Sequence, residues 1–147
     1  MLKSILSAAA ALALVSPALA QTAIDGDTIR IGAERFRLWG IDAPEARQTC
    51  ADGWPAGRVA SQALAALMQG RVVSCEPRGH DRYGRTVALC RADGRDLGQQ
   101  MVRAGLALAF VRYSVDYVKD EATAKAGKLG VHAHPCDPPW QWRAASH

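Results

Sequence analysis

Residues 24–46, IDGDTIRIGAERFRLWGIDAPEA, constrain the fold of this chain more than any other stretch. Apolar and polar side chains alternate in two runs, at 22–31 and 34–42, and a period of two is typical of strands with one buried face. Gly32 and Ala33 separate the runs and predict a turn. The stretch therefore predicts a β-hairpin that carries several acidic and basic side chains.

The rest of the chain predicts an α+β fold. Further strands are expected at 71–75, 85–91 and 106–111. Helices are expected at 56–69, at 94–105 with Asp96 as N-cap and Gly105 at its end, and from Ser114 as N-cap to Gly130. About five short strands among three helices favour a five-stranded OB-fold β-barrel. We expect residues 21–147 to form a single domain with a Trp- and Pro-rich tail.

The first 20 residues have the pattern of a secretory signal peptide. A basic residue is followed by an apolar run over 5–15 and by small residues at Ala18 and Ala20, which predicts cleavage before Gln21. A membrane anchor is the alternative, but the run is shorter than the roughly 20 residues that a spanning helix needs. Cleavage would leave 147 minus 20, or 127, residues in the periplasm or the medium.

All four cysteines follow the predicted cleavage point, and an even number in an oxidising compartment predicts two disulfides. Cys75 and Cys90 end two apolar runs that can pair as neighbouring strands, which would leave Cys50 with Cys136. The other two connectivities stay open at this stage. A zinc site at His132, His134 and Cys136 is a weaker alternative, because the chain has no C-x-x-C pair.

The acidic residues of the hairpin suggest a metal site. Asp25 and Asp27 flank Gly26, and Asp42 closes the second strand near the same end of the hairpin. Two carboxylates and a main-chain oxygen suit a hard cation such as calcium or magnesium. Taken singly, each aspartate is more easily explained by a turn or a helix cap.

Basic residues close to these acids favour phosphate chemistry. Arg37 lies opposite the apolar face of its strand, Glu45 follows Pro44, and Arg85 follows a predicted turn at Tyr83. Arginines that neutralise a phosphate and a carboxylate that acts as a base are the groups that phosphodiester hydrolysis needs. Fourteen of the 18 basic residues are arginine, although the net charge is only +4.

Three motifs, IDGDTIRI, FRLWGIDAPE and DRYGR, closely resemble those of the thermonuclease family, the secreted calcium-dependent nucleases typified by staphylococcal nuclease. The similarity extends to VRAGLA and covers most of residues 22–130. The resemblance implies an OB-fold barrel with three helices that cleaves DNA and RNA with Ca²⁺, and we expect a monomer. A degenerate, non-catalytic member that binds nucleic acid or protein is the alternative, but every motif acid and arginine is present.

The resemblance also implies a role for each motif residue. Asp27 and Asp42 would bind calcium through their carboxylates and Ala43 through its main-chain carbonyl, with Asp25 as a nearby acid. The remaining residues would act on the substrate: Arg37 and Arg85 on the phosphate, Glu45 on the attacking water, and Tyr83 beside the nucleotide, unless Tyr83 is a buried structural residue.

The chain departs from the best-known member of the family in a few places. Ala43 replaces a threonine, and a base-stacking tyrosine aligns near Val111. The cysteines and the tail HAHPCDPPWQWR are also foreign to that member. We expect Trp140 and Trp142 to pack against the barrel under a disulfide at Cys136, with stacking on nucleic acid as the alternative.

Overall fold

A computed structural model describes residues 19–146 of the chain. The predicted signal peptide 1–20 lies almost wholly outside the described residues. Within them no helix is long and apolar enough to cross a membrane.

Most strands belong to one bent sheet of order β1-β2-β3-β6-β5, with β7 added beside β6. A second, two-stranded sheet pairs β4 with β8. The strands are β1 (Gln21–Ala23), β2 (Thr28–Ile31), β3 (Glu34–Leu38), β4 (Ile41–Asp42), β5 (Val73–His80), β6 (Thr86–Ala92), β7 (Arg95–Asp96) and β8 (Leu108–Ala109). The α+β, OB-type fold is therefore confirmed, with its hydrogen-bonded strands divided between two sheets.

The predicted hairpin is present as β2 and β3, which pair with Ile31 opposite Glu34 across the Gly32 turn. The run at 22–31 is not one strand, because it folds back on itself so that β1 pairs antiparallel with β2. Gly26 lies in the connection, where an added Cβ would come within 2.8 Å of Ala60 and within 2.7 Å of Ala43. Only glycine, which has no Cβ, lets this connection pass between Ala60 and Ala43.

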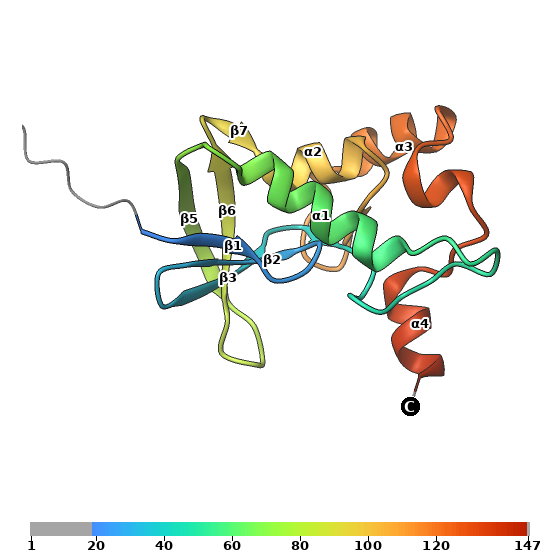
Figure 1. Cartoon of the computed structure of the whole chain (residues 1–147), viewed down its shortest axis with the longest axis horizontal. Coiled ribbons are helices and arrows are strands. Elements are labelled where there is room, and N and C mark those ends of the chain that lie inside the picture. Colours follow the sequence, from blue (N-terminus) through green and yellow to red (C-terminus); the bar gives the residue numbers. More distant parts are fainter. Residues whose placement is uncertain (1–18, 147) are drawn as a thin grey trace, which may run out of the picture.

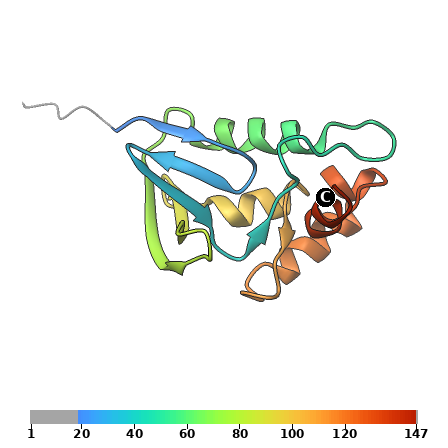
Figure 2. The ribbon, with the colours of Figure 1, turned by 90° about the horizontal axis from the view of Figure 1, so that it is seen from below.

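The described residues form four α-helices, α1 (Ala56–Met68), α2 (Leu97–Arg103), α3 (Val118–Ala126) and α4 (Pro139–Ala145), with a 3-10 turn at Gly130–Ala133. Figure 1 shows α1 lying across the sheet, and Figure 2 shows it from below, with α3 and α4 grouped at the opposite end of the molecule from β5. The core between α1, α2 and the sheet includes Ile29, Leu38, Leu64, Leu97 and Met101, each no more than 2% exposed.

Two helix predictions differ from the structure. The helix predicted from Ser114 begins only at Val118, because the Ser114 hydroxyl accepts a hydrogen bond from the Asp116 N–H in a local turn. A fourth helix, α4, forms in the tail, where Pro139 occupies a first-turn position that needs no N–H donor. In contrast, Asp96 caps α2 as predicted by accepting a hydrogen bond from the Gln99 N–H at 3.1 Å.

The structure joins Cys75 to Cys90 across β5 and β6, and Cys50 to Cys136 between the loop before α1 and the tail. These are the pairings that the apolar runs favour. Cys136 is therefore not available as a zinc ligand, and His134 instead pairs with Asp52 at 2.7 Å. Disulfides are typical of periplasmic or extracellular proteins.

Candidate active site

The candidate site lies where β2, β3 and β4 meet. Asp27 immediately precedes β2, Arg37 is in β3, and Asp42 ends β4. The Asp27 carbonyl accepts a hydrogen bond from the Leu38 N–H, and its Oδ2 accepts one from the Ala43 N–H at 2.9 Å. These bonds bring the Asp27 carboxylate from the start of the hairpin to the strand that carries Asp42.

The Arg37 guanidinium joins the two buried aspartates. Its Nη1 lies 2.6 Å from Asp27 Oδ1, and its Nη2 lies 3.4 Å from Asp42 Oδ1. Burial alone would raise the pKa of Asp27, but Arg37 and the Ala43 N–H outweigh that effect and hold the pKa below its usual value. Asp27 is therefore ionised at neutral pH although it is buried, and Arg37 is its cationic partner.

Asp25 lies next to this pair and is less strongly acidic. Its Oδ1 accepts a hydrogen bond from the Asp27 N–H at 3.0 Å. Burial, and then the negative charge of Asp27, raise the pKa of Asp25 to about 6. The carboxylate thus contributes to the negative potential around Asp27, while its hydrogen bond fixes the backbone of the connection.

The residues fit a hard divalent cation by the chemistry of their donors. Asp27 and Asp42 are 6% and 1% exposed and offer oxygen atoms to a common neighbour. Ala43 is buried beside them, with its N–H directed to Asp27. No group of three or more His, Cys, Asp or Glu side chains suited to a metal is present in residues 19–146. A cation there would thus need water, main-chain or substrate oxygens as well.

An open cleft of about 1080 Å³ lies beside Arg37, the partner of both aspartates. Arg37, Glu45, Tyr83 and Arg85, which come from three separate parts of the chain, all line it. Tyr83 is 69% exposed, so it is not the buried structural tyrosine of the alternative interpretation. The cleft also has other basic and aromatic side chains in its wall: Arg35, Arg82, Phe110, Arg112, Tyr113 and Trp140.

Asp81 holds Arg85 in position within the DRYGR turn. Asp81 Oδ2 accepts a hydrogen bond from Arg85 Nε at 2.6 Å, and Oδ1 accepts bonds from the Tyr83 and Arg85 N–H groups. Burial would raise the pKa of Asp81, but these bonds outweigh it and lower the pKa. Arg85 Nη1 also lies 3.4 Å from the Thr28 hydroxyl, which in turn contacts Asp27. The sequence interpretation assigned Asp81 no role, although its four-residue spacing from Arg85 was a usable indication.

Glu45 lies in a loop, and hydrogen bonds between its backbone and Gln48 hold it in place. Gln48 Oε1 accepts a hydrogen bond from the Glu45 N–H, and the Glu45 carbonyl accepts one from the Gln48 N–H. A Cβ on Gly57 would lie 1.8 Å from the Glu45 carbonyl oxygen, so α1 approaches this turn as closely as glycine allows. The loop is therefore held against the start of α1.

The profile of the family described as "Staphylococcal nuclease homologue" matches residues 35–133, which include Arg37, Asp42, Glu45 and Arg85. The chain belongs to the staphylococcal nuclease homologue family. The match leaves out β1, β2 with Asp27, and helix α4.

Named relatives agree with this membership. The chain is 39% identical over 118 residues to the "Succinoglycan biosynthesis protein ExoI" of Rhizobium meliloti (strain 1021), a match that covers 74% of this chain and 60% of that protein. It is 37% identical over 129 residues to an uncharacterized endonuclease of Escherichia coli O157:H7, covering 82% and 80% of the two chains. It is 34% identical over 122 residues to the "Probable staphylococcal-like nuclease CAN1" of Oryza sativa subsp. japonica, covering 80% of this chain and 35% of that protein.

Two features of the tail were not predicted. Trp140 is only partly covered: it is 40% exposed and lines the cleft, with its ring 6.2 Å from that of Phe110. Arg143 reaches the site, with Nη2 2.8 Å from Asp42 Oδ2 and Nη1 2.6 Å from Glu45 Oε1. No local pattern could indicate this contact, since 98 residues separate Arg143 from Glu45.

Proposed function

We propose that this chain is a secreted, calcium-dependent nuclease that hydrolyses phosphodiester bonds in DNA and RNA. The observation that carries the proposal is the convergence of Arg37, Glu45 and Arg85 on one open cleft beside two buried aspartates. The endonuclease named among its relatives supports it. We further propose that residues 1–20 are a cleaved signal peptide and that residues 21–147 act as a monomer.

The substrate would be held by the arginines. A phosphodiester in the cleft would meet Arg37 on the β3 side and Arg85 on the DRYGR side. Bidentate guanidinium groups stabilise the additional negative charge that develops on phosphate oxygens in the transition state. Tyr83, exposed beside Arg85, would contact the nucleotide through its ring or hydroxyl.

Glu45 would accept the proton of the attacking water. It lines the same cleft as both arginines, and its side chain is 38% exposed, so water reaches its carboxylate. Asp27, Asp42 and the Ala43 carbonyl would hold calcium, with Asp25 beside them. When bound, calcium would supply positive charge near the reacting phosphate.

The proposal is tested with the full chain, expressed in an exporting bacterial host and purified with its disulfides formed. Release of acid-soluble nucleotides from single-stranded DNA and from RNA is measured with calcium, with magnesium and with a chelator. We expect calcium-dependent release, lowered about 100-fold or more by Glu45→Gln and by Arg85→Ala. Glu34→Gln and Arg30→Ala are matched controls, because both residues are exposed on the hairpin and lie outside the cleft lining.

If the folded protein releases no nucleotide with either cation, the proposed nuclease activity is refuted. Retained binding of single-stranded DNA in that case would favour the non-catalytic binding module. The intact mass of the exported protein shows whether Gln21 is its first residue, which tests the proposed cleavage.

A further inference from the structure

Arg143 of α4 occupies the carboxylates on which the proposed reaction depends. Its Nη2 donates to Asp42 Oδ2 at 2.8 Å, and its Nη1 lies 3.2 Å from Asp42 Oδ1 and 2.6 Å from Glu45 Oε1. One guanidinium therefore engages both oxygens of the proposed metal ligand and one oxygen of the proposed base. Arg37 also contacts Asp42 Oδ1, so each oxygen of Asp42 contacts at least one guanidinium.

This arrangement places Arg143 in competition with a cation. Asp42 is 1% exposed, so a divalent ion can reach its oxygens only from the site itself. Asp42 Oδ1 contacts both Arg37 and Arg143, and Oδ2 contacts Arg143, so a calcium ion bound to these oxygens would lie beside the Arg143 guanidinium. Repulsion between the two cations therefore weakens the Arg143 contacts when the ion binds.

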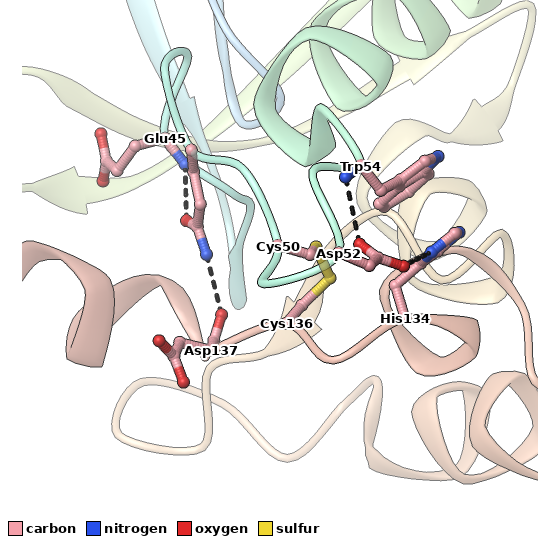
Figure 3. The surroundings of a disulfide bond; sticks show 8 residues. Glu45, Cys50, Asp52, Trp54, His134, Cys136 and Asp137 are labelled. Carbon is pink, nitrogen blue, oxygen red and sulfur yellow. Dashed lines mark hydrogen bonds and ion pairs between the residues drawn. A yellow bond between two sulfur atoms is a disulfide. The ribbon is translucent and has the colours of Figure 1, made fainter.

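The tail is built to keep Arg143 at the site. The disulfide between Cys50 and Cys136 fixes the chain seven residues before Arg143 to the loop that follows Glu45. Gln48, 1% exposed, links the same two segments: its Oε1 accepts from the Glu45 N–H and its Nε2 donates to the Asp137 carbonyl at 2.8 Å. Figure 3 shows this chain of hydrogen bonds beside the disulfide. The effective concentration of Arg143 at Asp42 is high for this reason.

Arg143 is also able to leave. Its side chain is 39% exposed and lies at the cleft wall, so α4 can carry the guanidinium away from Asp42 without unfolding the core. α4 is a single short helix that begins at Pro139 directly after Pro138, and its one buried residue is Pro139. The contact is therefore reversible, unlike the more enclosed pair between Arg37 and Asp27.

We propose that Arg143 is a latch that holds Asp42 and Glu45 in the metal-free protein, and that a divalent cation releases it by competing for Asp42. The latch is an autoinhibitory contact contributed by this chain's own C-terminal helix. It rests on the proposed function, since it assumes that Asp42 binds the cation.

Calcium affinity measured by isothermal titration calorimetry, without nucleic acid, tests the latch. Arg143→Gln is expected to tighten calcium binding about tenfold relative to the wild type, because the ion no longer displaces a paired guanidinium. Arg112→Gln removes the same charge from an exposed position in the same cleft, and we expect it to change the affinity less than threefold. Equal affinities for Arg143→Gln and Arg112→Gln would overturn the proposal.

Hydrogen exchange in the wild type is a second readout that needs no variant. Calcium is expected to speed the exchange of the α4 amides at residues 141–146 while leaving those of α2 unchanged. Unchanged or slower exchange at α4 with calcium bound would contradict release of the latch. These results differ from a failure of the proposed function, which would appear as the absence of calcium-dependent hydrolysis in the wild type.

Discussion

Arg37 donates to Asp27 across the hairpin with 2.6 Å between Nη1 and Oδ1, and the two side chains are only 15% and 8% exposed. A second carboxylate, Asp42, contacts the same guanidinium. This arginine is therefore a structural counter-ion as well as a candidate phosphate ligand, because it neutralises negative charge that the barrel has removed from water.

Replacing Arg37 with alanine is expected to destabilise the protein by about 3–5 kcal/mol, since it leaves two buried carboxylates without their shared partner. Arg103→Ala is the matched control. Arg103 also has an ion pair of 2.6 Å, with Asp120, but its side chain is 60% exposed, and we expect a loss of less than about 1 kcal/mol. Urea denaturation at neutral pH without added metal measures both, and equal losses would contradict the structural role of Arg37.

Asp81→Ala is expected to lower the rate of DNA hydrolysis about tenfold or more without a comparable loss of stability. Asp81 places the Arg85 guanidinium through a bond of 2.6 Å, and without it the guanidinium becomes free to leave the cleft wall. Asp93→Ala is the control, because Asp93 is exposed and lies outside the cleft lining, where it approaches Arg71 at 4.0 Å and accepts a hydrogen bond from the Val72 N–H at 3.2 Å. The idea fails if Asp81→Ala and Asp93→Ala hydrolyse DNA at the same rate.

The two disulfides are expected to contribute unequally to stability. They close loops with separations of 86 and 15 residues, and the chain-entropy relation gives about 4.6 kcal/mol for Cys50–Cys136 against about 3 kcal/mol for Cys75–Cys90. Paired serine substitutions at each bridge, compared by thermal and urea unfolding, measure the difference. If removing Cys50–Cys136 lowers the free energy of unfolding less than removing Cys75–Cys90 does, loop length does not decide the contribution of these disulfides.

His132 is expected to make the protein less stable as the pH falls. Burial lowers the pKa of this histidine, and its Nε2 is buried without a hydrogen-bond partner among the described residues. The unfolded state therefore binds a proton at a higher pH than the folded state, so this contribution is fully present above the unfolded pKa of about 6.5 and is lost as the pH falls through the lower folded pKa. His132→Gln should flatten the fall in the free energy of unfolding between pH 7 and pH 5. Identical pH profiles for the two proteins would contradict this, because they would mean that the pKa of His132 is the same in the folded and unfolded states.

The hairpin and its charges could be predicted because the information is local. Strand period, the Gly32 turn and the spacing of the acids together place Asp27, Arg37 and Asp42 within a single supersecondary unit, and the structure brings them into contact. The break between β1 and β2 was not predicted, because it depends on how closely Gly26 approaches Ala60 and Ala43. That approach is a property of the packed core.

The tail shows most clearly what only the tertiary structure decides. The sequence of the tail shows two tryptophans and a cysteine that could form a disulfide. In the structure, the disulfide to Cys50 places the tail beside the candidate site. Helix α4, the exposure of Trp140 and the ion pairs of Arg143 followed from that placement. Contacts between residues about 100 positions apart leave no periodic pattern, since they arise from the packing of segments and not from the spacing of side chains along the chain. The sequence by itself thus determined the fold class, the family and the chemistry of the motif residues, whereas tertiary packing decided which arginine holds Asp42 and Glu45.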